Sequence, residues 1–216
     1  MLTKNTLKSK YAKHRKAIES RLVEFESVGR LEDGAVFAEL CFCILTPQSK
    51  ASAASKAIGG IFKAGNGGVH GADTLQIIKS SGVRFHNTKA QRLRMAHSLF
   101  FGKGRKMAIS ELLALAKKDE PAARDWLVEN VMGIGMKEAG HFLRNVGHNR
   151  ELAILDRHII ANLHSLGAIK SRPKTLSRAK YLKIEREMKR FSKSAGIPMS
   201  HLDLLFWSEQ TGYIFK

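Results

Sequence analysis

The segment Gly133-Ile134-Gly135-Met136-Lys137 combines residues that could bind an anion with one that could form a covalent bond. A Gly-x-Gly turn between two helices directs backbone N–H groups toward one outside point, which suits a phosphate oxygen. Lys137 falls in the first turn of the second helix, where the helix dipole disfavours an added positive charge. This placement suits a lysine that serves as a neutral nucleophile. The glycines alone are also consistent with an ordinary turn between helices.

Asp156, after the apolar run Ala153-Ile154-Leu155, has two compatible interpretations. It is a natural N-cap for a helix that begins at Arg157, because its side chain can accept hydrogen bonds from the first turn. A carboxylate can also stabilise positive charge that develops during a reaction. Only the second role requires the negative charge, so an Asn could serve the first role but not the second.

The charge balance predicts a polyanionic partner. The 216 residues include 37 Lys plus Arg against 19 Asp plus Glu, which gives a formal net charge of +18 and a pI near 10.2. A surface adapted to salt or heat is the alternative, but such adaptation normally raises both signs of charge together. We therefore expect the protein to bind nucleic acid.

Cysteine and apolar content restrict the compartment and the cofactors. Cys41 and Cys43 are the two cysteines, which cannot form a disulfide framework or an iron–sulfur cluster, and their apolar surroundings favour core packing. The N-terminus lacks the apolar segment of a signal peptide, and the stretch 35–45 is too short to span a bilayer. We expect a cytoplasmic, nucleoid-associated protein that has no membrane partner, no metal and no cofactor.

Apolar residues recur at intervals of three and four along most of the chain, which predicts an all-α fold. The breaks between these segments carry the Gly, Pro, Asn and Ser that are typical of turns. The predicted helices cover approximately residues 7–28, 35–45, 49–62, 74–80, 88–101, 110–118, 121–131, 137–146, 156–166, 180–195 and 199–211.

The run 133–139, followed by Leu155-Asp156-Arg157-His158, resembles the signature of the helix-hairpin-helix DNA glycosylase superfamily. Within it, the segment 142–147 and the ending from Phe206-Trp207 to Phe215-Lys216 resemble the type 2 8-oxoguanine DNA glycosylase/lyases. The resemblance implies that Lys137 attacks C1′ of an extruded nucleotide, expels the base and forms a Schiff base, and that β-elimination then cleaves the strand. It implies that Asp156 stabilises positive charge on the sugar and helps to activate the lysine.

The resemblance also suggests contacts to the substrate. Trp207 is the candidate for stacking on the extruded base, and the hairpin glycines Gly133 and Gly135 for binding the DNA backbone. Lys216 with its free carboxylate, and Asp203 with less support, are candidates for reading the oxidised edge of the base, although a charged terminus is more often frayed. Gln48 matches the position from which endonuclease III inserts a polar side chain into the emptied gap, but an ordinary turn residue is an equal alternative.

The fold implied by the resemblance is two helical lobes that flank a DNA-binding cleft. The central lobe is expected over residues 35–148, and the second lobe over residues 1–34 plus 149–216. The expected partner is double-stranded DNA that contains an oxidised base, bound by a monomer. Two alternatives stay open: a glycosylase/lyase for oxidised pyrimidines or another lesion, and a non-catalytic DNA-binding module, which would leave Lys137 and Asp156 unexplained.

Overall fold

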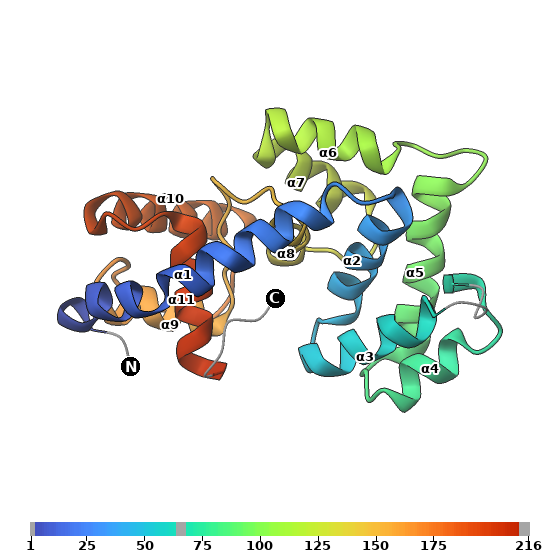
Figure 1. Cartoon of the computed structure of the whole chain (residues 1–216), viewed down its shortest axis with the longest axis horizontal. Helices are drawn as coiled ribbons and strands as arrows, with labels where there is room; N and C mark the ends of the chain where they lie inside the picture. Colours follow the sequence, from blue (N-terminus) through green and yellow to red (C-terminus); the bar gives the residue numbers. More distant parts are fainter. Residues whose placement is uncertain (1–2, 64–67, 212–216) are drawn as a thin grey trace. The chain divides into compact units, whose positions relative to one another are not determined.

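The computed structural model describes residues 3–63 and 68–211, and all regular structure within these ranges is helical (Figure 1). The all-α prediction is therefore confirmed. The elements are α1 (Lys4–Val28), α2 (Asp33–Leu45), α3 (Ala51–Ile61), the short 3-10 helix η1 (Gly68–His70), α4 (Thr74–Ser80), α5 (His86–Phe101), α6 (Ile109–Lys118), α7 (Glu120–Asn130), α8 (Met136–Asn145), α9 (Arg157–Ser165), α10 (Arg178–Ala195) and α11 (Met199–Thr211).

Several helices begin one to three residues from the predicted start, and for α1 and α3 a local interaction explains the difference. Helix α1 begins at Lys4, because the backbone N–H of Thr6 donates to Thr3 Oγ1 (3.3 Å) and that of Thr3 to Thr6 Oγ1 (3.1 Å), which caps the helix. Helix α3 begins at Ala51 instead of residue 49, because residues 46–49 form a turn closed by the Ser49 N–H and the Thr46 carbonyl at 2.9 Å.

The chain divides into two compact units. One comprises Met1–Gly29 and Leu143–Lys216, and is called the terminal unit below; the other, the central unit, comprises Arg30–Phe142. The observed boundaries, at residues 29/30 and 142/143, come a few residues before the expected lobe boundaries at 34/35 and 148/149. Lys137 belongs to the central unit and Asp156 to the terminal unit.

The central unit is organised around α2, which packs against α3, α5 and α6. Every residue from Leu40 to Leu45 is buried, as expected for a helix that is apolar on all sides. Cys41 and Cys43 lie within this run as fully buried thiols that form no disulfide, and burial raises the pKa of Cys41 well above its usual value. The prediction that they serve core packing is confirmed.

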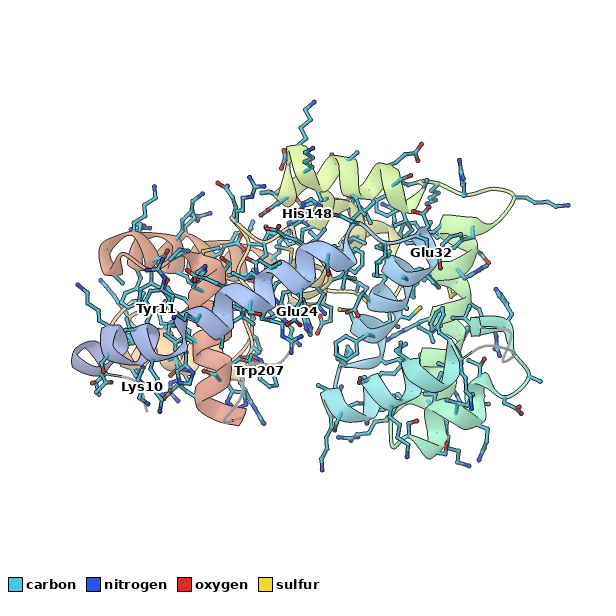
Figure 2. The ribbon with its side chains drawn as sticks, in the orientation of Figure 1. Lys10, Tyr11, Glu24, Glu32, His148 and Trp207 are labelled. Atoms are coloured by element: carbon cyan, nitrogen blue, oxygen red, sulfur yellow. The ribbon has the colours of Figure 1, made fainter. Side chains whose placement is uncertain are left out.

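The terminal unit is organised around α11, which contacts α1, α9 and α10 (Figure 1). Leu202, Leu205 and Phe206 are its fully buried residues at this centre. At its edge, Tyr11 of α1 places its hydroxyl 3.0 Å from Nδ1 of His201 on α11 (Figure 2). The apolar face of α11 therefore fixes α1 and α9 within one core.

A buried ion pair crosses the terminal unit. Arg144, near the end of α8, places Nη1 2.6 Å from Oδ2 of Asp203 on α11, and both side chains are almost fully buried. The same guanidinium donates to Asn145 Oδ1 and lies 5.1 Å from the ring centroid of Phe25. The pair thus ties α8, α11 and α1 together in a place that water does not reach.

Removal of one partner of this pair should destabilise the fold strongly, because it leaves a charge buried without compensation. We expect Arg144→Met to lower the free energy of unfolding by about 3 to 5 kcal/mol, measured by urea denaturation. The double variant Arg144→Met/Asp203→Leu should recover most of that loss, since it removes both charges.

The exposed pair between Lys189 and Glu151, at 3.0 Å, provides the matched control. We expect Lys189→Met to change stability by less than about 1 kcal/mol, because solvent screens an exposed ion pair. Similar losses for Arg144→Met and Lys189→Met would contradict a special role for burial.

Candidate active site

The Gly-x-Gly segment forms the predicted turn between α7 and α8. Gly133 has a φ of +88°, a left-handed conformation that side chains disfavour, and a Cβ there would lie 2.6 Å from Cδ of Arg92. Ile134 points into the core, and the Ala139 N–H bonds to the Gly135 carbonyl at 2.9 Å. Glycine at position 133 is therefore required both by backbone conformation and by the close approach of an arginine from α5.

Lys137 is the second residue of α8, in the first turn, as the sequence predicts. Its side chain is 30% exposed, and the nearest carboxylate oxygen, Oε1 of Glu138, lies 3.5 Å from Nζ. This distance is longer than an N–H···O hydrogen bond. Lys137 and Glu138 therefore form an ion pair without a hydrogen bond, and the Lys137 side chain remains partly exposed.

Asp156 caps α9, so the N-cap interpretation is confirmed. One oxygen, Oδ1, accepts hydrogen bonds from the backbone N–H groups of His158 and Ile159, each at 2.8 Å. The other oxygen, Oδ2, has no hydrogen-bond partner among residues 3–63 and 68–211. The carboxylate is thus held through one oxygen, while the second makes no hydrogen bond to a described residue.

The segment before Asp156 is fixed by two side chains of α10 that sequence reasoning missed. The Tyr181 hydroxyl donates to the carbonyl of Ala153 and accepts from the N–H of Leu155 at 3.2 Å, and Glu185 Oε2 accepts from the Ala153 N–H at 2.7 Å. These bonds satisfy the backbone of a buried, extended run that has no neighbouring strand. They determine where α9 begins and therefore where Asp156 lies.

Gln48 lies at the third position of the turn 46–49, exposed, with a φ of +57°. A turn with Pro at the second position and a positive φ at the third is of type II, where Gly or Asn is the usual third residue. The turn is held by a residue that sequence reasoning also missed. Lys89 Nζ donates to the carbonyls of Leu45 and Pro47, both at 2.7 Å, and to Ser49 Oγ at 3.0 Å.

A groove of about 510 Å³ lies beside this turn in the central unit. Its lining includes Gln48 and Ser49 on one side and Gly82 and Arg84 on the other. The cations Lys50, Lys56 and Arg84 line it without any carboxylate. A groove of this composition suits a phosphate backbone.

The residues expected to contact the base lie on α11 or beyond it. Trp207 is half-buried on α11 (Figure 2). Asp203 is one turn earlier and is engaged in the buried pair with Arg144, so it could reach a base only by sharing or leaving that pair. Lys216 lies outside the described residues.

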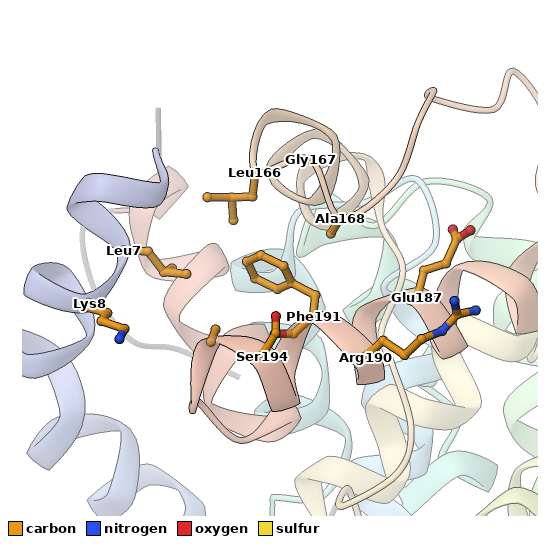
Figure 3. Close-up of a pocket in the computed structure, with 10 residues that line it drawn as sticks. Leu7, Lys8, Leu166, Gly167, Ala168, Glu187, Arg190, Phe191 and Ser194 are labelled. Atoms are coloured by element: carbon orange, nitrogen blue, oxygen red, sulfur yellow. The ribbon is translucent and has the colours of Figure 1, made fainter.

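A larger pocket of about 530 Å³ lies within the terminal unit, between α1, the turn after α9, and α10 (Figure 3). Leu7, Leu166 and Phe191 form its apolar part, and Glu187 and Arg190 lie at its polar end. None of the described site residues predicted from the sequence is among its lining residues. This pocket is thus separate from Lys137, Asp156 and Trp207.

Two features are absent from the described part of the chain: a metal-binding cluster and a membrane-spanning helix. Among residues 3–63 and 68–211, no group of three or more His, Cys, Asp or Glu side chains is arranged to hold a metal ion. No helix in these ranges combines the length and the apolar character needed to cross a membrane.

Comparisons with known proteins agree with one another. A family model described as 8-oxoguanine DNA glycosylase matches residues 18–197 of the chain. A relative from Fusobacterium nucleatum named 8-oxoguanine DNA glycosylase/AP lyase is 37% identical, with 98% of this chain and 97% of the relative covered. A relative of the same name from Methanocaldococcus jannaschii is 35% identical, with 100% of both chains covered.

Solved structures show the same similarity. The 8-oxoguanine DNA glycosylase of Thermotoga maritima superposes with a TM-score of 0.84 at 30% identity, covering 99% of this chain and 98% of that one. The Methanocaldococcus jannaschii 8-oxoguanine glycosylase/lyase, solved with a 15mer DNA containing 8-oxoguanine, has a TM-score of 0.79 at 32% identity, covering 98% of this chain and 100% of that one.

The two hairpin glycines should tolerate substitution differently. We expect Gly133→Ala to lower the free energy of unfolding by more than about 1 kcal/mol, because alanine is strained at this φ and its Cβ would displace Arg92. Gly135→Ala should cost less, since Gly135 lacks the positive φ and its Cβ would meet only the movable Glu138 carboxylate at 3.2 Å. Melting temperatures of the two variants measure the difference, and equal shifts would refute the conformational argument.

Proposed function

This chain belongs to the 8-oxoguanine DNA glycosylase family, and we propose on that premise that it excises 8-oxoguanine from double-stranded DNA and cleaves the strand at the resulting abasic site. The observation that carries the proposal is the amine of Lys137, which follows the hairpin directly, is partly exposed and makes no hydrogen bond to a described residue. A non-catalytic DNA-binding module would leave the placement of Lys137 in the first turn of a helix unexplained.

Lys137 acts as the nucleophile. Its neutral amine forms a bond to C1′ of the damaged nucleotide while the glycosidic bond breaks, and the electron pair of that bond leaves with the base, which takes up a proton. Opening of the sugar ring then gives a Schiff base between Nζ and C1′. Loss of a proton from C2′ and of the 3′ phosphate from C3′ completes strand cleavage by β-elimination.

Asp156 supplies the negative charge that this route needs. Positive charge develops on the sugar as the base departs, and a fixed carboxylate stabilises that charge. It can also accept the proton that Lys137 loses before attack. The free oxygen Oδ2 supports this role, because the capping bonds to Oδ1 hold the carboxylate in place without using both oxygens.

The remaining contacts follow from the side chains that are present. The half-buried Trp207 stacks on the extruded base, and Lys216, with Asp203 as a second group, recognises its oxidised edge. Gln48 enters the space that the base leaves. Gly133 and Gly135 bind the DNA backbone together with the cationic groove of Lys50, Lys56 and Arg84. We further propose that the enzyme acts as a monomer in the cytoplasm, on the DNA of the nucleoid.

The Schiff base gives a direct test of Lys137. Borohydride should trap the wild-type protein covalently on a duplex that contains one 8-oxoguanine, because it reduces the imine to a stable amine. We expect Lys137→Gln to form no trapped complex on a denaturing gel. Lys118→Gln, which alters an exposed lysine at the end of α6, should trap like the wild type.

The same gel also tests which lesion the enzyme prefers. A duplex with an oxidised pyrimidine at the same position should give much less trapped complex than the 8-oxoguanine duplex. Undiminished trapping by Lys137→Gln would exclude Lys137 as the nucleophile, and 8-oxoguanine as the poorest substrate would exclude the proposed specificity.

Substitution of Asp156 by asparagine distinguishes the proposed catalytic role of the carboxylate from its role as a helix cap. We expect Asp156→Asn to slow base release by about 100-fold or more, the scale seen when one stabilising electrostatic group is lost. Its melting temperature should change little, since the amide oxygen can still accept both capping bonds. Asp156→Ala should lose the rate and also about 1 kcal/mol of stability.

Single-turnover base release and thermal denaturation measure the two effects separately. An Asp156→Asn variant with near-normal rate would show that the carboxylate is only a cap.

A further inference from the structure

Two residues other than glycine have a positive φ in the described part of the chain: Gln48 at 57° and Phe85 at 58°. Side chains clash with the backbone in this conformation, so such residues persist only where the surroundings enforce the geometry. Strained residues of this kind gather at functional sites more than elsewhere. That these two are linked through one residue therefore calls for a physical explanation.

Lys89 connects both strained residues. Its backbone N–H donates to the carbonyl of Phe85 at 3.0 Å, in the first turn of α5. Its ammonium group donates to Leu45, Pro47 and Ser49 around Gln48. All three N–H donors of the ammonium group are thus used on a single turn.

Ser49 strengthens the same connection. Its hydroxyl oxygen accepts from Lys89 Nζ and also from the backbone N–H of Arg84, both at 3.0 Å. Arg84 precedes Phe85, and its guanidinium lies 5.5 Å from the centroid of the Phe85 ring. The turn that carries Gln48 and the turn that carries Phe85 are therefore fixed to each other by hydrogen bonds.

The contrast in burial points to a function beyond packing. Lys89 is 2% exposed, whereas Phe85 is 54% exposed and Gln48 is also exposed. Burying an ammonium group is unfavourable unless its hydrogen bonds compensate. Here the compensated group supports the turn of the exposed Gln48, and Ser49 links that turn to the one that carries Phe85. Glycine in place of Gln48 and Phe85 would remove the strain.

We propose that Lys89 is a positioning residue for opening the DNA duplex: it holds Gln48 and Phe85 in the left-handed conformation that presents an amide and an aromatic ring to the gap beside the extruded nucleotide. The inference rests on the proposed glycosylase function and deepens it. The Gln48 amide pairs with the base left without a partner, and the Phe85 ring stacks on the opened step. Lys89 touches neither DNA nor the reacting atoms.

The test compares two duplexes that differ only opposite the lesion. One places cytosine opposite 8-oxoguanine, and the other places a tetrahydrofuran abasic analogue there, so that no orphan base has to be accommodated. We expect Lys89→Met to slow single-turnover release opposite cytosine by about tenfold, in line with the loss of a buried hydrogen-bond partner. Release opposite the analogue should fall by less than about threefold.

Two further variants connect the effect to the turn. Ser49→Ala removes one acceptor and should shift the ratio between the duplexes in the same direction, by a smaller factor. Gln48→Ala should reproduce the Lys89→Met ratio, and the double variant should lose little more, because both changes disable one unit. If Lys89→Met fails to fold, Ser49→Ala decides the question by the same ratio.

Thr74→Val is the matched control, because the buried Thr74 hydroxyl donates to the carbonyl of Gly68 at 2.9 Å, at the opposite end of α4 from Gly82 and Arg84. It should lower stability without changing the ratio. Equal losses on both duplexes for Lys89→Met and Ser49→Ala would overturn the inference and leave the glycosylase function standing. A wild-type protein that releases 8-oxoguanine from neither duplex would overturn both.

Discussion

The contact on which the proposed chemistry depends is the pair of hydrogen bonds from the first turn of α9 to a single oxygen of Asp156. A carboxylate that caps a helix is rigid, and its second oxygen can act on a reactant without any reorganisation. Serine or asparagine would cap as well, but neither provides a negative charge. The cap is therefore compatible with the catalytic role that we propose for the same side chain.

Elsewhere the chain fixes its functional turns in two opposite ways. At the hairpin, Gly133 adopts a positive φ without strain, and this lets Arg92 approach the backbone. At the turn 46–49 the functional group that we propose is the Gln48 side chain itself, so glycine could not replace it, and the strain of Gln48 is offset by hydrogen bonds from Lys89. A turn that binds DNA through its backbone can use glycine. A turn that inserts a side chain into DNA needs other residues to hold its backbone in place.

The features that could be predicted from the sequence are those that local interactions determine. The helices, the glycine turn before Lys137 and the cap at Asp156 all depend on neighbouring residues. The contacts of Lys89 with residues 45–49, of Arg144 with Asp203 and of Tyr181 with Ala153 connect distant parts of the chain, and no spacing rule reveals them. The positive φ of Gln48 could not be predicted from the sequence either, because a glutamine gives no indication of this conformation. Asp203 illustrates the consequence: the family resemblance suggested a contact with the base, but nothing in the sequence indicated its buried ion pair with Arg144.

The pKa of Lys89 depends on the positive charges that surround it. Burial, together with the positive charges of Arg92 and Arg84, lowers the pKa of Lys89 to about 8. Near pH 7 the group therefore still carries its charge and its three donors. The repulsion from Arg84 and Arg92 acts in the protein without DNA, and a phosphate that approaches these arginines weakens it. An anionic partner thus favours the charged form of Lys89, which is the form that donates all three hydrogen bonds.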